Sequence, residues 1–272
     1  MPEANILTQR ALVVECLSRS IGELSWLEPL KMHSEHRLPQ SWAAIGFDTN
    51  GLKQLRRFDL MKRSSIFTYL QSKSVPIILP VQAVQEYWNN HGIFTKDVQL
   101  ESDTRKLLRQ FEKASGGQVA SARYDAIATL LNQLAEEAAD SQNPHLLKES
   151  IDLWESLLAN STLAHMPRHE ILSIGEMHFA SGIAPGFADG SKGANRLGDF
   201  FVWADFLMGL QMIGLGPNDS SNSLVVFVTD DEKRDWITSG VPHPTLLGEI
   251  YHLTGRPLSI LTMNELCRIV QP

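Results

Sequence analysis

Several acidic side chains stand at or near the ends of short apolar runs. The five carboxylates at such positions are Asp48, Glu86, Asp199, Asp230 and Asp231. Asp48 follows the apolar run 43–47 directly, and Asp230 comes just after the run 224–228. Asp199 begins a predicted helix. The carboxyl ends of parallel strands meet at one edge of a sheet, so these side chains could converge there.

Converging carboxylates repel one another unless a positive charge lies between them. At an effective dielectric constant near 20, two such charges about 5 Å apart repel by roughly 3 kcal/mol. A divalent cation removes this cost, and oxygen-only ligands suit Mg²⁺ or Mn²⁺ rather than zinc. Such cations can activate water and stabilise a leaving oxygen in phosphoryl chemistry. The alternative interpretation is that each Asp caps a helix or shapes a turn.

The composition is that of a globular protein with no overall attraction for polyanions. The 272 residues are 43% hydrophobic and 20% charged, which excludes a disordered or collagen-like chain. Lys and Arg number 24 against 31 Asp and Glu, a formal net charge of −7. A nucleic-acid partner would therefore need a local basic patch or bound cations.

Other features of the sequence predict a cytoplasmic protein without a membrane partner. Two cysteines near opposite ends cannot form a disulfide framework. The longest apolar runs, 75–80 and 224–228, fall far below the roughly 18 residues that a membrane-spanning helix needs. Glu15 interrupts the apolar residues 11–14, which therefore do not resemble a signal-peptide core.

Short apolar runs alternate with helical patterns over most of the chain. Strands are predicted at 43–47, 75–79, 224–228 and 258–261. Helices between and after them are predicted at 52–72, 81–90, 199–213, 244–254 and 263–270. This alternation favours an α/β fold built on a parallel sheet.

Three segments stand apart from this alternation. Residues 1–40 predict an N-terminal helical extension. Residues from about 97 to 180 show no strand signal and predict a helical insertion, with helices at 104–114, 120–139, 146–159 and 170–179. Residues 182–198 form a glycine-rich loop, and loops of that length in compact domains are usually functional.

Four segments carry motifs in a consistent order: 45–50, 79–87, 184–203 and 226–236. The first reads Ile-Gly-Phe-Asp-Thr-Asn, and the last reads Val-Phe-Val-Thr-Asp-Asp-Glu-Lys-Arg-Asp-Trp. Together they resemble the PIN-like domain nucleases, in particular a larger bacterial subgroup with a helical insertion. The resemblance implies a three-layer α/β/α domain over 41–272 with a central parallel sheet of about four to five strands. The insertion at about 97–180 and the extension 1–40 carry none of it.

The same resemblance implies an endonuclease that hydrolyses nucleic-acid phosphodiesters, most often RNA, with Mg²⁺ or Mn²⁺. The implied catalytic and metal-binding quartet is Asp48, Glu86, Asp199 and Asp230. Asn50 would orient its neighbouring acid or a phosphate. Of Asp231 and Asp235, one would join the metal ligands and the other would cap the following turn. Asp189 competes with Asp199 for the third position.

Basic residues near these motifs suggest how a phosphate backbone would be held. Lys192 and Arg196 lie in the glycine-rich loop and would hold the scissile phosphate. Arg56 and Arg57 lie on the helix after Asp48 and would track the backbone beside the site. The alternative is that both pairs are solvated charges. Similarly, Trp236 could stack on a base or pack in the core.

Two further functions could use these residues. A haloacid-dehalogenase-type phosphatase would use Asp48 as its nucleophile, Lys192 as a charge clamp, and Asp231 with Asp235 as metal ligands. Such enzymes typically need a second Asp where this chain has Asn50. A catalytically silent PIN-like scaffold would instead bind RNA or a partner.

The expected partners are therefore a nucleic acid, with RNA favoured, and a protein or second copy of the chain at the helical insertion. A toxin, an antiviral effector and an RNA-processing enzyme would each suit these residues.

Overall fold

The chain divides into two compact units. The computed structural model describes residues 2–35, 37–89, 103–107, 109–110, 122–140, 144–189, 196–217, 222–231 and 233–270. The first unit comprises Met1–Tyr87 and Leu157–Pro272, and the second comprises Trp88–Ser156. The predicted insertion limits of about 97 and 180 therefore enclose residues of both units.

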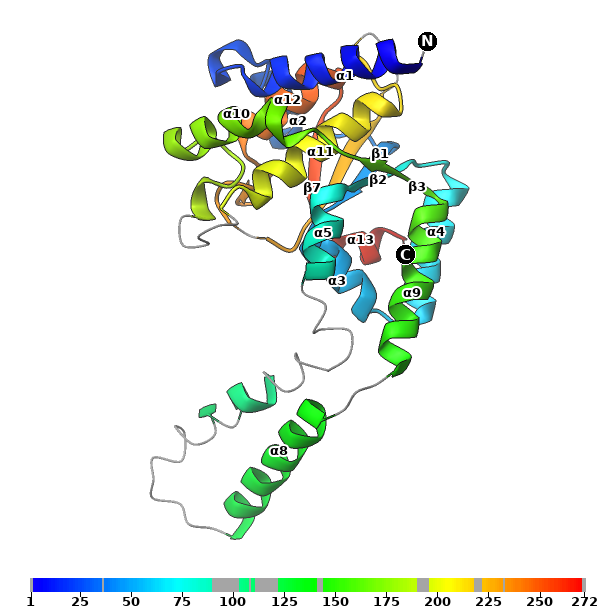
Figure 1. Cartoon of the computed structure of the whole chain (residues 1–272), viewed down its shortest axis with the longest axis vertical. Coiled ribbons are helices and arrows are strands. Elements are labelled where there is room, and N and C mark those ends of the chain that lie inside the picture. The colour runs from blue at the N-terminus through cyan, green and yellow to red at the C-terminus, as the bar shows by residue number, and fades with distance from the viewer. Residues whose placement is uncertain are drawn as a thin grey trace. The chain divides into compact units, whose positions relative to one another are not determined.

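A five-stranded parallel sheet forms the centre of the first unit (Figure 1). Its strands are β1 (Trp42–Phe47), β2 (Ile77–Pro80), β3 (Ser161–Ala164), β4 (Leu224–Val228) and β7 (Leu258–Leu261). Their spatial order is β3-β2-β1-β4-β7, and every neighbouring pair is parallel. The order of connection reverses between β1 and β4. In open α/β sheets, ligands bind beyond the carboxyl ends of the strands at such a switch point.

Helices cover both faces of this sheet and give the three-layer α/β/α arrangement (Figure 1). On one face, α11 (Gly198–Met212) packs on β2 and β3, and α12 (Pro244–Thr254) packs on β7. On the other face, α3 (Thr49–Arg57) packs on β1 and α13 (Met263–Val270) on β7, with α4 (Leu60–Ser72) against α13.

Further helices lie outside α11 and α12. The helices α1 (Pro2–Leu17) and α10 (Arg168–Ser181) contact α11, and α2 (Leu27–Ser34) contacts α12. The helix α5 (Val81–Asn89) begins directly after β2. Short elements complete the unit: the 3₁₀ turns η1 (Ile21–Glu23) and η2 (Phe187–Asp189), and the hairpin of β5 (Ile237–Thr238) and β6 (Val241–Pro242).

The described part of the second unit is helical. It contains α8 (Ala122–Asp140) and most of α9 (Pro144–Ala159). Within this unit the rings of Trp88 and Trp154 lie 6.0 Å apart, centroid to centroid. Among the described residues of the whole chain, no helix is long and apolar enough to cross a membrane.

The central strands are buried because helices cover both sides of the sheet. Every residue of β2 and β4 is buried, as are the last four residues of β1. Continuous apolar runs, rather than alternating patterns, are typical of such parallel strands. This is why the predicted strands 43–47, 224–228 and 258–261 are confirmed almost residue by residue.

Two predictions about the elements are wrong. The strand β3 lies inside 97–180, where no strand is predicted. Only one of its four residues, Ser-Thr-Leu-Ala, is buried, so they form no apolar run that would indicate a strand. The single helix predicted at 52–72 is two helices, α3 and α4. Asp59 separates them, since its side chain accepts a hydrogen bond from the Lys62 N–H at 2.8 Å and caps a new helix.

Gly209 allows α11 to approach the sheet closely. A Cβ atom at this position would lie 2.3 Å from Ile78 Cγ2 and 3.0 Å from Ala164 Cβ. We expect Gly209→Ala to lower the free energy of unfolding by about 1–3 kcal/mol, because overpacking outweighs the gain in helix propensity. Gly216→Ala is the control, since its Cβ meets nothing within 4 Å. Equal losses in urea denaturation would contradict this expectation.

Candidate functional site

Asp48 lies at the switch point between β1 and β4. It follows β1 and is the N-cap of α3, where its Oδ1 accepts a hydrogen bond from the Thr49 N–H at 2.5 Å. Its Oδ2 accepts a hydrogen bond from Thr229 Oγ1 at 2.9 Å. Because Thr229 follows β4 directly, this contact joins the carboxyl ends of the two central strands.

The surroundings of Asp48 disfavour an uncompensated negative charge. The residue is only 4% exposed. Burial raises the pKa of its carboxyl group above the ordinary value, hydrogen bonds from Thr229 and Thr49 lower it, and the charge of Glu86 raises it further. A nearby cation would relieve both effects that raise the pKa, burial and the charge of Glu86.

Glu86 is joined to Asp48 through Thr49. Thr49 Oγ1 donates a hydrogen bond to Glu86 Oε2 at 2.9 Å, and Gln82 Nε2 donates one to Glu86 Oε1 at 3.0 Å. The helix α5 brings Glu86 to this place because it begins at the carboxyl end of β2, next to β1.

Asp199 and Asp231 meet at the ammonium group of Lys233. Lys233 Nζ lies 2.7 Å from Asp231 Oδ2 and 3.3 Å from Asp199 Oδ2. Asp231 Oδ1 accepts a hydrogen bond from the Lys233 N–H at 3.1 Å. The N–H of Asp231 donates to Thr229 Oγ1 at 3.0 Å, so Thr229 links this group to Asp48.

These contacts form one continuous series, which we call the acidic series. Its members are Glu86, Thr49, Asp48, Thr229, Asp231, Lys233 and Asp199. All of them belong to the first unit. Within the described residues, no group of three or more His, Cys, Asp or Glu side chains is close enough to hold a metal ion. The carboxylates therefore fit Mg²⁺ or Mn²⁺ in kind, but they are not gathered around one point.

Asp230 makes a different contact from its neighbour Asp231. It is exposed, and its Oδ1 accepts a hydrogen bond from the Met263 N–H at 3.0 Å, at the start of α13. Asp231, rather than Asp230, is the residue after β4 whose side chain shares a partner with Asp199.

Asp235 is fully buried and holds the chain before α11. Its Oδ2 accepts hydrogen bonds from the N–H groups of Gly186 at 2.9 Å and Ala188 at 3.2 Å. It thus stabilises the segment that contains η2. The side chain of Asp189 lies outside the described residues.

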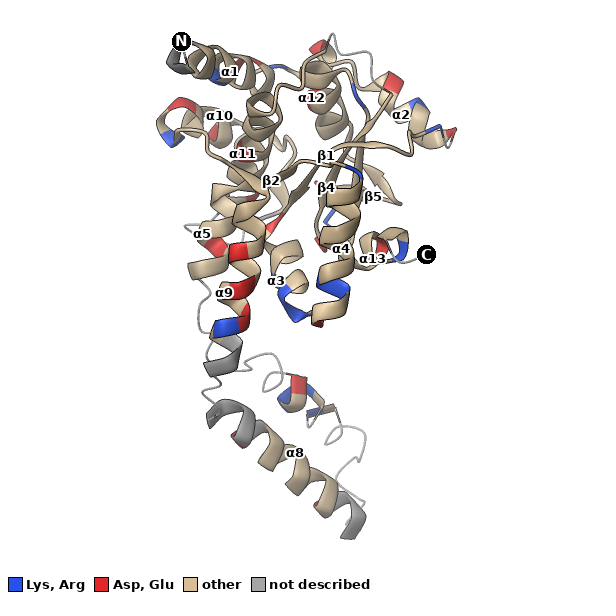
Figure 2. Cartoon of the chain, turned by 90° about the vertical axis from the view of Figure 1, so that its right-hand side faces the viewer, with Lys and Arg blue, Asp and Glu red and all other residues tan. Residues whose placement is uncertain are grey.

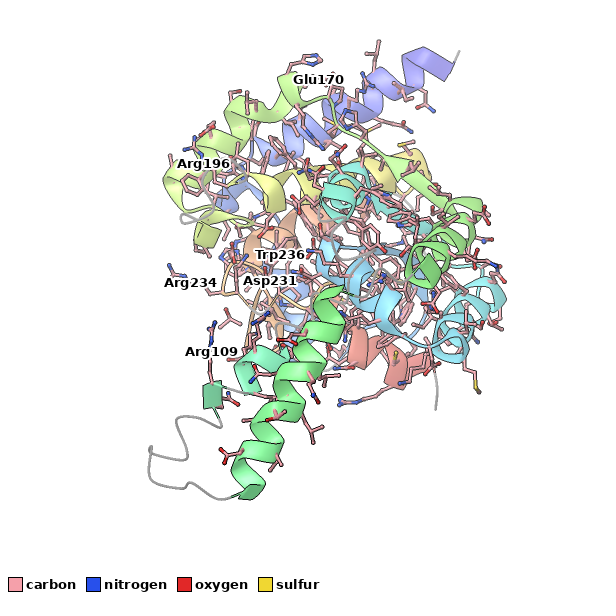
Figure 3. All side chains as sticks on the ribbon, turned by 60° about the horizontal axis from the view of Figure 1, so that its bottom comes forward. Arg109, Glu170, Arg196, Asp231, Arg234 and Trp236 are labelled. Atoms are coloured by element: carbon pink, nitrogen blue, oxygen red, sulfur yellow. The ribbon has the colours of Figure 1, made fainter. Side chains whose placement is uncertain are left out.

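Of the predicted phosphate-binding residues, Asn50 contacts the acidic series, because its backbone N–H hydrogen-bonds to Asp48 and lowers the pKa of that carboxyl group. Arg196 makes its described contacts elsewhere. Arg196 is exposed, and its Nη2 lies 2.5 Å from Glu176 Oε2 while its guanidinium lies over the Phe179 ring. Figure 3 shows Arg196 apart from Asp231 and Trp236. Lys192 lies outside the described residues.

The basic residues of α3 lie at the opposite end of the helix from Asp48. Arg56 and Arg57 are in its last turn, roughly 12 Å along the axis from the N-cap. Figure 2 shows basic residues, in blue, at one end of α3. Asn50 is exposed in the first turn, next to Thr49. Of these three residues, Asn50 is therefore the one beside the acidic series.

Trp236 supports Asp199 from the protein core. Its Nε1 donates a hydrogen bond to Asp199 Oδ2 at 3.3 Å, and its ring stacks on Phe227 with centroids 5.3 Å apart. The ring is 1% exposed, so it packs in the core instead of offering a surface for a base.

Asp205 is a buried acid that the sequence reasoning missed. On α11, its carboxylate accepts hydrogen bonds from the N–H groups of Gln82 and Met166, both at 2.8 Å. Arg168 donates to it through Nη1 at 2.8 Å and Nη2 at 2.9 Å. Gln82 lies in the first turn of α5, so Asp205 fixes the helix that presents Glu86. The indication in the sequence was an acidic residue in the middle of an apolar helical segment, which predicts a buried partner for the acid.

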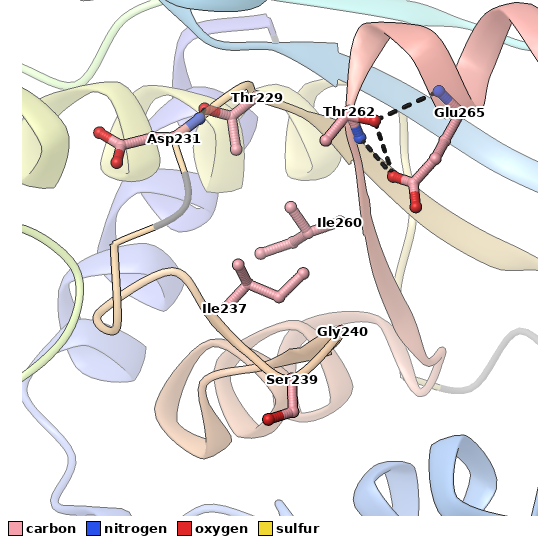
Figure 4. A pocket seen from close by; sticks show the side chains of 8 residues that line it. All are labelled: Thr229, Asp231, Ile237, Ser239, Gly240, Ile260, Thr262 and Glu265. Atoms are coloured by element: carbon pink, nitrogen blue, oxygen red, sulfur yellow. Dashed lines mark hydrogen bonds between the residues drawn. The ribbon is translucent and has the colours of Figure 1, made fainter.

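A pocket of about 320 Å³ opens beside Asp231, at the carboxyl ends of β4 and β7 (Figure 4). Ile237 and Ile260 supply its apolar part, and its polar lining comes from Thr229, Asp231, Ser239, Thr262 and Glu265. Its volume is at the lower end of the range for small-ligand sites. The acidic series therefore borders a cavity that a substrate group could enter.

Residues 125–243 match a family model described as a PIN like domain. The matched range includes Asp199, Asp231 and Lys233, whereas Asp48 and Glu86 precede it. No curated protein and no solved structure matched the chain.

Proposed function

Because the chain is a PIN-like domain protein, we propose that it is a divalent-metal-dependent endonuclease that cleaves single-stranded RNA. The observation that carries this proposal is the acidic series at the switch between β1 and β4. The four acids of this series come from segments that are far apart in the sequence, and one set of contacts connects them. The series lies beside a pocket. The choice of RNA rests on the resemblance to PIN-like nucleases.

Asp48, Glu86, Asp199 and Asp231 are the proposed ligands of Mg²⁺ or Mn²⁺. When bound by carboxylates, such a cation supplies an activated water molecule and stabilises negative charge on a phosphate. Asp231 is proposed ahead of Asp230 because it already shares Lys233 with Asp199, whereas Asp230 accepts a hydrogen bond from α13.

Neighbouring groups of the protein would hold these acids in position. Thr49 and Thr229 each contact a different oxygen of Asp48, through a backbone N–H and a hydroxyl respectively. Gln82 fixes Glu86, and the indole N–H of Trp236 fixes Asp199. Substrate would approach from the pocket, because Thr229 and Asp231 belong both to its lining and to the acidic series.

One observation favours a second candidate, a catalytically silent PIN-like scaffold. Among the described residues, the carboxylates form no ready-made metal-binding group. Such a scaffold would bind RNA or a protein partner without cutting. Metal-dependent cleavage therefore separates the two candidates.

Cleavage of a single-stranded RNA by the purified full chain tests the proposal. We expect cutting with Mn²⁺ or Mg²⁺ and none with EDTA. Asp199→Asn should reduce the rate roughly 100-fold or more, because it removes a charged metal ligand. Glu170→Gln is the control, since this acid lies on α10 and pairs with Arg10 at 3.6 Å.

Three results would contradict the proposal: cutting in EDTA, unchanged cutting by Asp199→Asn, or no cutting by the wild type with either metal. Circular dichroism of both variants checks that they fold. A DNA oligonucleotide of the same sequence tests the preference for RNA.

A further inference from the structure

We propose that Lys233 is an internal cation between Asp199 and Asp231, and that a divalent metal ion must displace its ammonium group to bind there. This inference rests on the proposed function, because it concerns the same carboxylates. It adds a role for a residue that neither the predicted quartet nor the predicted phosphate-binding set contains.

The geometry places the ammonium group on the oxygens that a metal ion would take. Lys233 Nζ contacts the Oδ2 atoms of both acids, at 2.7 Å from Asp231 and 3.3 Å from Asp199. Both side chains are only 12% exposed, whereas that of Lys233 is 29% exposed. An ammonium group and a divalent cation cannot occupy the same position between these oxygens, so their binding is mutually exclusive.

The charges explain why a lysine is useful at this position. Two poorly solvated carboxylates that face one point repel each other, and a single positive charge between them offsets the repulsion. Lys233 thus keeps Asp199 and Asp231 oriented toward a common point without a metal ion. It also gives a physical reason why the described carboxylates do not close into a metal-binding group.

The attachment of Lys233 allows its ammonium group to leave without moving the backbone. The Lys233 N–H is fixed by Asp231 Oδ1 at 3.1 Å, at the start of the turn that leads to Trp236. The ammonium group itself is a compact charge on a flexible four-carbon stem, and it is the more exposed partner. Displacement therefore requires rotation of one side chain only.

This arrangement sets the apparent metal affinity by competition. A metal ion gains the two carboxylates but must break two ion pairs, so removing the ammonium group should tighten metal binding and weaken the metal-free fold. Partly exposed ion pairs contribute up to about 1 kcal/mol each, so two pairs correspond to a change in affinity of up to roughly thirtyfold.

Calorimetric titration of Mn²⁺ into the full chain tests the inference. We expect Lys233→Met to bind Mn²⁺ about tenfold more tightly than the wild type. Lys233→Arg keeps the charge and should stay within about threefold of the wild type. Arg234→Met is the matched control, because it removes a positive charge one residue away that lies over the Phe187 ring.

Thermal unfolding supplies an independent readout. In EDTA, Lys233→Met should unfold at a lower temperature than the wild type, and saturating Mn²⁺ should raise its unfolding temperature by more than that of the wild type. If Lys233→Met does not fold, Lys233→Gln, which keeps a polar side chain without the charge, replaces it in both measurements.

The outcomes separate this inference from the proposed function. Equal or weaker Mn²⁺ binding by the neutral variant, when the wild type binds, overturns the role of Lys233 and leaves the nuclease proposal standing. Binding by the neutral variant alone supports the inference. No Mn²⁺ binding by any of the proteins overturns both.

Discussion

Asp205→Ala should lower the free energy of unfolding by about 3–5 kcal/mol, because it removes a fully buried carboxylate on which two backbone amides and the partly exposed guanidinium of Arg168 depend. The Asp205 carboxylate is completely buried and accepts four hydrogen bonds, two from Arg168 and one each from the N–H groups of Gln82 and Met166. The alanine variant would leave the guanidinium and both amides without this acceptor. Urea denaturation at pH 7 measures the loss.

Glu170→Ala is the matched control for that experiment. Glu170 also pairs with an arginine, Arg10, but at 3.6 Å and with both side chains more than a quarter exposed. Its loss should stay below about 1 kcal/mol, because solvent screens such pairs. Similar losses in the two variants would contradict the structural role assigned to Asp205. Since Gln82 lies in the first turn of α5, the Asp205 variant should also weaken any metal binding that uses Glu86.

Glu249→Gln should abolish a large part of the pH dependence of stability. Glu249 lies on α12, fully buried, and one of its oxygens accepts a hydrogen bond from Trp203 Nε1 at 2.6 Å. Its Oε1 has no hydrogen-bond partner among the described residues. Burial raises the pKa of this carboxyl group from its ordinary value of 4.5 to about 8, against a lowering effect of the Trp203 hydrogen bond.

The sign of the effect follows from proton binding in the two states. Between pH 4.5 and about 8, the unfolded chain has released the Glu249 proton while the folded chain retains it. The unfolded state therefore binds fewer protons, and the contribution of Glu249 to stability falls by up to roughly 1.4 kcal/mol per pH unit as the pH rises. Below pH 4.5 the Glu249 carboxyl group is protonated in both the folded and the unfolded state, so its contribution to stability no longer changes with pH.

Denaturant unfolding of the wild type and Glu249→Gln at pH 5, 6, 7 and 8 tests this prediction. The variant should be the more stable protein at pH 8 and should lose that advantage toward pH 5. The difference between the two proteins isolates Glu249 from every other titrating group. Parallel pH profiles would show that the buried carboxyl group does not titrate in this range.

The strands that the sequence predicts correctly are those whose own residues form a continuous apolar run. The strands β1, β4 and β7 are continuous apolar runs, so their positions follow from the sequence pattern. The edge strand β3 has no such run, because only one of its four residues is buried. The strands of the β5–β6 hairpin are only two residues long, too short for an apolar pattern. The sequence indicates this hairpin only through the turn residues Ser239-Gly240, which both have positive φ in the structure.

The candidate site was predictable where it depends on the ends of strands. Asp48 could be located because it ends an apolar run, and helix α11 begins close to Asp199 as expected. The contact of Asp199 with Lys233, which Asp231 shares, was not predictable, because it depends on the path that the chain takes after β4. Asp205 and Glu249 were missed for a related reason: an acid in an apolar helix signals a buried contact, but tertiary packing decides the partner.

The hydrogen bond between Asp48 and Thr229 spans 181 positions of the chain. During translation, Asp48 and Glu86 leave the ribosome long before residues 199–231 exist, so the early fragment has two of the acids and none of their later partners. Contacts of such long sequence separation also require loop closure over most of the chain before they can form. The proposed metal-binding set would therefore remain incomplete on a nascent chain until residues 199–231 have left the ribosome.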